Sequence, residues 1–190
     1  MVLLNAKFAN EHSFKKFPNF SLENIDHRLI DSDEIAGENG LLVMFICNHC
    51  PYVKAIVKNI VQDVNDLKNM GINSVAINSN DATEYPEDSF EKMIEFAKSH
   101  NFSFPYLVDK TQKVAKEFGA VCTPDFFLFT KDKDRNLILS HKGRLNDFIY
   151  TKSGLQTSDG LIVQRELIII AQYLTGKSRS SMGCSIKWRD

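Results

Sequence analysis

The chain has 190 residues, of which 43% are hydrophobic and 25% charged, a composition typical of one folded globular domain. Its net charge of −1 gives no electrostatic attraction to nucleic acid or to an anionic membrane, so neither is expected as a partner. The first residues lack a signal peptide pattern, and no apolar run approaches the roughly 20 residues of a membrane span. We therefore expect one cytoplasmic domain over residues 1–190, with a lead-in over 1–18 and a polar tail over 177–190.

The first half of the chain predicts a buried strand followed by a long helix. Short strands are expected before Gly40, where periodicity is weak. Six apolar residues then follow one another over 41–46, as in a strand buried on both faces of a sheet. Apolar residues next recur at three- and four-residue steps over 53–67, which predicts a helix that stops at Gly71. Pro51 fits the first turn of that helix, where its missing N–H costs nothing.

The second half alternates strands and helices. Strands are predicted over 72–78, 104–108, 125–130 and 137–142, and helices around 90–97, 114–118 and 161–174. Two pairs have the spacing of a helix capping box, Asp88 with Glu91 and Asp109 with Gln112. A charged turn joins the last two strands, which suggests an antiparallel hairpin. The pattern predicts an α/β fold with a central mixed sheet, a parallel core plus this hairpin, and helices on both faces.

The most informative feature is a Cys-x-x-Cys pair, Cys47 and Cys50, between the buried strand and the long helix. Ligand sites of α/β proteins usually lie at this end of the sheet. The reactive form of cysteine is the thiolate, and the amino end of a helix stabilises an anion. His49, when protonated, would stabilise a neighbouring thiolate further. The pair therefore predicts a redox site that cycles between dithiol and disulfide.

Other interpretations of the same residues stay open at this point. The cysteines could be two buried residues that share this spacing, and His49 could be a solvated loop residue. They could also form half of a zinc or copper site, completed by Cys122 and a histidine. However, the chain has no second Cys-x-x-Cys pair, and no ligand spacing is found among the remaining histidines, His12, His27, His100 and His141. Metal binding is therefore an alternative without a complete ligand set.

Several segments resemble a known family. The segment Phe45-Ile-Cys-Asn-His-Cys-Pro-Tyr-Val-Lys54 closely resembles the active-site loop of the peroxiredoxin-like branch of the alkyl hydroperoxide reductase/thiol-specific antioxidant (redoxin) family. Residues 78–81, 104–109, 119–129 and 182–188 are similar to the same branch. The resemblance covers most of the chain from about Asn19. It implies a thioredoxin-like fold and an antioxidant or disulfide-exchange activity based on thiols.

The resemblance also puts Thr123 and Pro124 opposite the two cysteines, where thioredoxin folds carry a cis-proline. A cis X–Pro bond is uncommon and usually marks a deliberate feature. The resemblance implies that the backbone of Thr123 faces an extended substrate segment near the disulfide. The alternative is an ordinary trans-proline that opens the following strand.

Two enzymatic mechanisms fit the resemblance. In thiol–disulfide exchange, which we favour, Cys47 is the exposed nucleophile and Cys50 resolves the mixed disulfide. In peroxide reduction, Cys50 attacks the peroxide and becomes a sulfenic acid. The peroxiredoxin pattern Pro-x-x-x-Thr-x-x-Cys is broken here, because Cys47 stands at the Thr position and Val43 at the Pro position. A peroxidase would also need an arginine near the thiolate, for which Arg144 is the candidate.

Three residues are possible accessories to this site. Cys122, two residues before Pro124, is either a third redox partner or a small buried residue. Cys184, in the tail, could be a resolving or intermolecular cysteine, although an incidental structural role is favoured. Arg144 is at least as easily interpreted as a surface cation. We expect no cofactor, a disulfide, thiol or peroxide substrate, either protein or small molecule, and a cellular thiol as reductant.

Overall fold

The computed structural model describes residues 3–5, 16–143 and 181–189, which form one seven-stranded sheet, one three-stranded sheet and the helices that cover them. Arg144 and the helix predicted over 161–174 lie outside these ranges. In spatial order, the strands of the larger sheet are β3 (Leu29–Asp31), β2 (Ser21–Asn24), β6 (Tyr106–Val108), β5 (Ile72–Asn78), β4 (Gly40–Phe45), β8 (Asp125–Lys131) and β9 (Leu137–Gly143). That residues 1–190 form a single domain stays a prediction.

The larger sheet has a parallel centre with antiparallel edges. Strands β4, β5 and β6 run parallel to one another. On one side β8 and β9 form the predicted antiparallel hairpin, and on the other side β2 and β3 form a second hairpin. Strand β4 lies between β5 and β8, and all six of its residues are buried. The mixed sheet and the central buried strand are thus confirmed.

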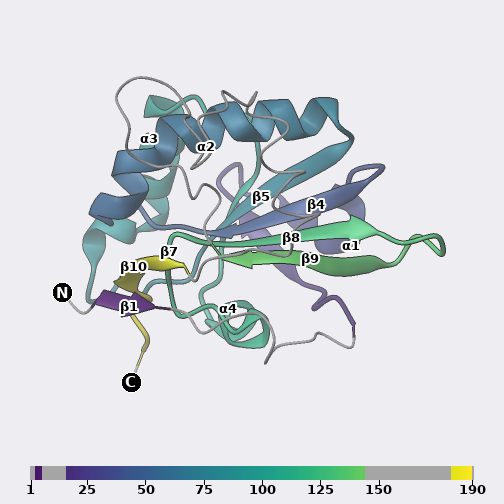
Figure 1. The fold of residues 1–190 in the computed structure, drawn as a ribbon. Helices are drawn as coiled ribbons and strands as arrows, with labels where there is room; N and C mark the ends of the chain where they lie inside the picture. The colour runs from purple at the N-terminus through teal and green to yellow at the C-terminus, as the bar shows by residue number, and fades with distance from the viewer. Residues whose placement is uncertain (1–2, 6–15, 144–180, 190) are drawn as a thin grey trace, which may run out of the picture.

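Helices cover both faces of this sheet, as Figure 1 shows. α2 (Pro51–Asn69) and α3 (Phe90–Ser99) lie over one face, while α4 (Lys113–Phe118) lies under the other. Alternate residues of β4 divide between the two layers, because successive side chains of a strand point to opposite faces. Leu42 and Met44 join the core beneath α2, and Val43 and Phe45 join the core above α4. A short helix, α1 (Ser32–Ile35), follows β3, and none of the described helices has the length and apolarity that a membrane crossing requires.

The two predicted capping boxes are wrong in detail. The N-cap of α3 is Ser89, whose hydroxyl accepts the amide N–H of Lys92, and Asp88 turns elsewhere. The N-cap of α4 is Gln112, although the carboxylate of Asp109 does accept an amide N–H from the first turn of that helix. In each case a neighbouring residue takes the cap, because side-chain spacing alone does not fix which residue leaves the helical conformation first.

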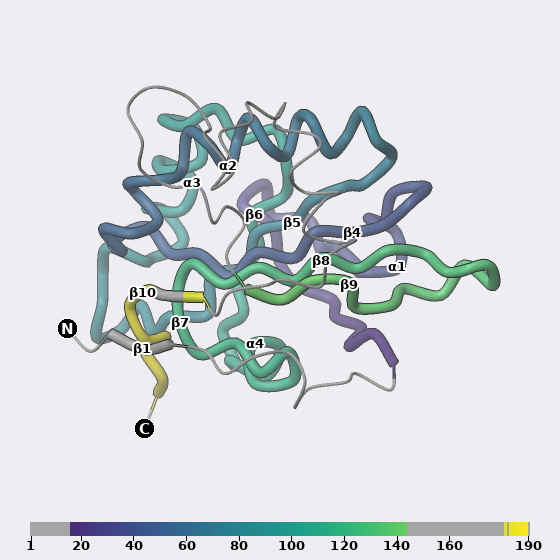
Figure 2. The backbone as a smooth tube through the Cα atoms, viewed as in Figure 1, coloured from purple at the N-terminus to yellow at the C-terminus, as the bar shows by residue number. Residues whose placement is uncertain are grey.

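A second, smaller sheet joins the two ends of the described chain. It consists of β1 (Leu3–Asn5), β10 (Met182–Ser185) and β7 (Cys122–Thr123), with β10 in the middle and both pairings antiparallel. Figure 2 shows β10 beside β7, at the end of the molecule where β4 gives way to α2. The tail predicted to be polar therefore contributes a strand that lies next to the cysteine loop.

Candidate active site

The two cysteines lie in the loop that joins β4 to α2. Strand β4 ends at Phe45 and α2 begins at Pro51, so Cys50 is the N-cap residue of a 19-residue helix. The backbone of Cys50 is extended, and its carbonyl accepts the N–H of Lys54, the first hydrogen bond of the helix. The predicted position of the pair, between a buried strand and a helix start, is confirmed.

Thr123 contacts both sulfur atoms. Its hydroxyl oxygen lies 3.2 Å from Cys47 Sγ, and its carbonyl oxygen lies 3.2 Å from Cys50 Sγ and accepts the thiol when Cys50 is protonated. The bond between Thr123 and Pro124 is cis, as the resemblance implied. The structure thus brings together four of the predicted site residues, which come from positions more than 70 apart in the sequence.

The expectation that Cys47 is the exposed sulfur is wrong. The exposed fractions of Cys47 and Cys50 are both 0%, and both residues belong to the core cluster beneath α2. Both sulfur atoms contact Thr123 and lie among the buried side chains of that cluster.

The two thiols differ in pKa. The hydrogen bond from the thiol of Cys47 lowers the pKa of Cys50 to about 4, and the amides of Val53 and Cys184 act in the same direction, against the effect of burial. The same hydrogen bond raises the pKa of Cys47 well above its ordinary value, and burial and the nearby charge of Asp88 add to that effect. The anion is therefore stabilised on Cys50, at the helix start, where unpaired amides attract negative charge.

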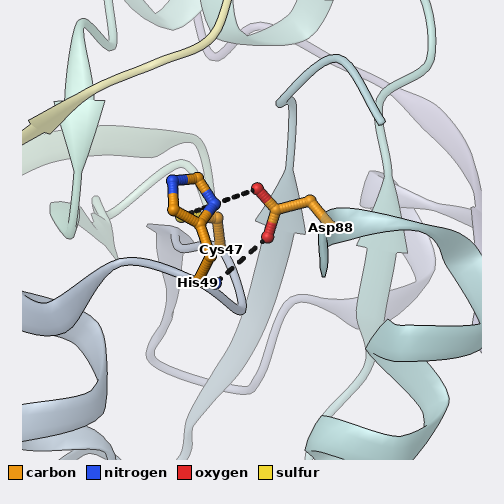
Figure 3. A group of neighbouring side chains, drawn as sticks. All are labelled: Cys47, His49 and Asp88. Atoms are coloured by element: carbon orange, nitrogen blue, oxygen red, sulfur yellow. Dashed lines mark hydrogen bonds and ion pairs between the residues drawn. The ribbon is translucent and has the colours of Figure 1, made fainter. Parts of the chain in front are cut away.

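Asp88 is a buried carboxylate that holds the loop between the cysteines. Its Oδ1 accepts the backbone N–H groups of Asn48, at 2.8 Å, and His49, at 3.2 Å. Its Oδ2 lies 2.6 Å from Nδ1 of His49 and accepts the side-chain amide of Asn80 over 2.7 Å. Figure 3 shows the carboxylate facing both the imidazole ring and the backbone of the loop.

His49 is part of this arrangement and is not simply a solvated loop residue. Its Nδ1 also lies 3.9 Å from Cys47 Sγ, and its ring stacks on that of Tyr85. The hydrogen bond with Asp88 raises the pKa of His49, against the effect of burial. Burial opposes ionisation of Asp88, but the hydrogen bonds from His49 and Asn80 outweigh it and lower the pKa of that carboxyl. The pair therefore favours an imidazolium next to a carboxylate.

Asp88 is a site residue that was not predicted, because its spacing to Glu91 matches a capping box. The available signal was the neighbouring Ser89, which is an equally good N-cap and leaves the aspartate free for another role. Asn48 was missed as well. Its side chain accepts the hydroxyl of Tyr106 and donates to the carbonyl of Glu87, so it fixes the loop against β6 and against the turn before α3.

Of the accessory residues, Cys184 lies at the site, whereas the sulfur of Cys122 faces Pro124. Cys184 lies opposite Thr123 in the pairing of β10 with β7 and belongs to the same buried cluster as Cys47 and Cys50. Cys122 precedes Thr123 in β7 and directs its sulfur toward the carbonyl oxygen of Pro124, 3.9 Å away. Burial raises the pKa of the Cys122 thiol, so this residue has the properties of a small buried side chain and not of a nucleophile.

The sequence matches a family model over much of its length. The model of the AhpC/TSA family matches residues 14–137, about two thirds of the chain. The chain belongs to the AhpC/TSA family. Membership supports a redox function in general, and no curated protein matches the chain.

Solved structures agree with this assignment. An uncharacterized conserved protein from Geobacillus kaustophilus is 37% identical, with a TM-score of 0.81 over 100% of this chain and 97% of that one. A hypothetical protein from Sinorhizobium meliloti 1021 is 33% identical, with a TM-score of 0.74 over 94% and 95% of the two chains. A secreted Mycobacterium tuberculosis disulfide oxidoreductase, 13% identical, shares the fold with a TM-score of 0.53 over 82% and 95%. The predicted thioredoxin-like fold is confirmed.

The metal ligand set expected for the alternative hypothesis is not the set that this AhpC/TSA protein brings together. Within the described part of the chain, the side chains grouped closely enough for a metal ion are Cys47, His49 and Asp88, with ligand atoms within 4.8 Å of one another. Cys122, proposed from the sequence as a ligand, is not in the group. Nδ1 of His49 already pairs with the carboxylate of Asp88, so coordination through that nitrogen would break the pair. The arrangement fits an ion pair that positions the loop better than it fits a metal site.

Proposed function

We propose that this protein is a thiol–disulfide oxidoreductase in which Cys50 is the attacking thiolate and Cys47 is the resolving thiol. The observation that carries the proposal is that Cys50 is the N-cap residue of α2, whereas Cys47 Sγ lies within 4.8 Å of a carboxylate oxygen of Asp88. The helix start favours a negative charge on Cys50, and the carboxylate of Asp88 disfavours one on Cys47. These roles are the reverse of those that the spacing alone suggested.

The reaction consists of two thiol–disulfide exchanges. The Cys50 thiolate attacks one sulfur of the substrate disulfide, whose S–S bond breaks as its other sulfur leaves as a thiolate. Cys47 then loses its proton, and its sulfur attacks Cys50 Sγ in the mixed disulfide. The products are two substrate thiols and a Cys47–Cys50 disulfide. A cellular thiol would reduce this disulfide, and a cytoplasmic location, where thiols are kept reduced, is part of the proposal.

Substitution of each cysteine tests these roles. In a dithiothreitol-coupled assay with a disulfide-linked peptide, Cys50→Ser should lose activity by about a hundredfold or more, because it removes the nucleophile. Cys47→Ser should instead accumulate a mixed disulfide between Cys50 and the peptide, detectable by mass spectrometry without reduction. Cys122→Ala is the matched control and should retain the wild-type rate, because its sulfur faces Pro124. A mixed disulfide trapped on Cys47 in the Cys50→Ser protein would contradict the assignment.

Peroxide reduction by the same cysteine is a second candidate, favoured by the low pKa of Cys50 and by the family. The Cys50 thiolate would attack peroxide to give a sulfenic acid and water or an alcohol. Cys47 would then attack that sulfur, releasing water and forming the same disulfide. If this is the activity, stopped-flow mixing with hydrogen peroxide should show rapid consumption by the wild type and none by Cys50→Ser. Slow consumption by the wild type, next to fast exchange with disulfides, would exclude it.

A further inference from the structure

The backbone edge beside the cysteines is already occupied by the protein's own tail. The edge of Thr123 was expected to face an extended substrate segment. In the structure, β10 pairs with β7 there, with Cys184 opposite Thr123 and Ser185 opposite Cys122. Strand addition of this kind is how an extended peptide binds to an exposed sheet edge. The segment over 182–185 thus lies where a substrate strand would lie.

The register of this pairing places a third thiol, that of Cys184, at the site. Cys184 faces Thr123, whose carbonyl oxygen lies 3.2 Å from Cys50 Sγ. The amide and the thiol of Cys184, like the thiol of Cys47, lower the pKa of Cys50. The exposed fraction of Cys184 is 2%, and it lies in the same core cluster as the other two cysteines. Cys50 therefore shares one buried cluster with two other thiols, those of Cys47 and Cys184.

Backbone and side-chain contacts hold β10 close to β7. Gly183 has no room for a side chain, because a Cβ there would overlap the carbonyl oxygen of Thr123. After the strand, the amide of Ile186 donates to the carbonyl of Val121 over 3.0 Å, and the amide of Lys187 donates to the side chain of Asn80 over 2.9 Å. Asn80 also binds the carboxylate of Asp88, so the tail and the cysteine loop share one hydrogen-bond network.

We propose that Cys184 is a third redox thiol, presented to Cys50 by β10 in the position of an extended substrate. The inference rests on the proposed disulfide chemistry of Cys47 and Cys50. Once the Cys47–Cys50 disulfide has formed, the sulfur of Cys184 attacks Cys50 Sγ, the bond to Cys47 breaks, and a Cys50–Cys184 bond forms. The proton lost by Cys184 passes to the Cys47 thiolate, so no further oxidant or reductant is consumed.

This exchange gives the protein two alternative disulfides that share Cys50. The Cys50–Cys184 bond ties β10 covalently over the edge of Thr123, which closes the site to extended substrates while it frees Cys47. Burial and the neighbouring Cys50 raise the pKa of Cys184 to about 11, so attack by Cys184 is slow at neutral pH compared with attack by a more acidic thiol. The Cys50–Cys184 disulfide keeps the site oxidised and closed until an external thiol or Cys47 attacks it.

The test uses Cys47→Ser, in which Cys50 has no partner in the Cys-x-x-Cys pair. Diamide, which takes up the two electrons and two protons of disulfide formation, should convert this protein to a Cys50–Cys184 disulfide in nearly every molecule. Peptide mapping without reduction identifies the link. Cys47→Ser with Cys184→Ser should leave Cys50 without an internal partner, whereas Cys47→Ser with Cys122→Ala should behave as Cys47→Ser alone.

The outcomes separate the two proposals. If Cys50 of the oxidised Cys47→Ser protein is found free, joined to Cys122 or joined to a second molecule, Cys184 is not its partner and the inference fails. In that case a Cys47–Cys50 disulfide in the oxidised wild type would still support the proposed function. If the wild type and Cys184→Ser both fail to form the Cys47–Cys50 disulfide, the proposed function fails instead. In the wild type, we expect the map to contain both disulfides.

Discussion

Replacing Asp88 with alanine is expected to lower the free energy of unfolding by about 3 kcal/mol, because buried donors lose their acceptor. The carboxylate accepts the amides of Asn48 and His49 and the side chain of Asn80, and its own exposed fraction is only 2%. Removing one partner of a buried hydrogen bond costs about 1–3 kcal/mol. Asp88→Asn keeps an acceptor oxygen for the loop amides, so its loss should be roughly half as large.

The same two variants should narrow the difference in pKa between Cys47 and Cys50. The charge of Asp88 contributes to the raised pKa of Cys47, after the hydrogen bond to Cys50 and burial. Without that charge the pKa of Cys47 falls, and the difference between the two thiols narrows. We therefore expect the resolving step of Asp88→Asn to keep its rate to lower pH than that of the wild type, a change in pH profile that a merely structural role would not produce.

Urea unfolding at pH 7 and the pH dependence of single-turnover disulfide exchange measure these two effects. The matched control is Glu87→Gln, an exposed carboxylate next to Asp88 whose backbone carbonyl, and not its side chain, binds Asn48. It should leave stability and the pH profile at wild-type values. If Asp88→Asn shows the stability and the pH profile of the control, the carboxylate does not position the loop.

The part of the site that the sequence predicted is the part encoded locally. The strand of six apolar residues, Pro51 in the first turn and the Cys-x-x-Cys spacing all lie within 41–51, and all three were found in the expected places. Each depends on neighbouring residues in the chain, whose periodicity and capping preferences can be read directly. The central position of β4 also follows from its composition, since only a strand covered on both faces is apolar at every residue.

The residues that were missed act through contacts between distant parts of the chain. Asp88 binds a loop about 40 positions earlier, and nothing in its own neighbourhood distinguishes this role from that of a helix cap. The sequence left Cys184 between a redox and a structural role, because its place at the site depends on the pairing of β10 with β7, which a short polar tail does not specify. The wrong expectation that Cys47 is exposed has the same origin, because spacing does not show that the rest of the fold covers both sulfur atoms.

A second buried carboxyl, that of Asp125 on the face of the larger sheet opposite α2, makes the free energy of unfolding depend on pH. Asp125 begins β8, is fully buried, and accepts the hydroxyl of Ser181 over 2.5 Å through Oδ1. Its Oδ2 has no hydrogen-bond partner among the described residues. Burial raises the pKa of Asp125 from 3.8 to about 7, although Ser181 and the nearby Lys142 oppose the shift. The folded protein therefore holds a proton on this carboxyl at a pH where the unfolded chain has lost it.

This linkage predicts that the free energy of unfolding of the wild type declines between about pH 4 and pH 7. In Asp125→Asn the decline should be smaller. The stability that comes from the raised pKa is fully present below pH 3.8, the ordinary pKa of the carboxyl. This stability is lost as the pH rises through about 7. A shift of about three units corresponds to roughly 4 kcal/mol, so the wild type should lose stability by that order relative to Asp125→Asn across the interval. Urea unfolding at pH 4 and pH 8 measures the slope, and Asp134→Asn, on the exposed turn between β8 and β9, should keep the wild-type slope. Equal slopes for Asp125→Asn and the wild type would show that Asp125 is ionised in the folded protein at neutral pH, with Lys142 compensating its charge.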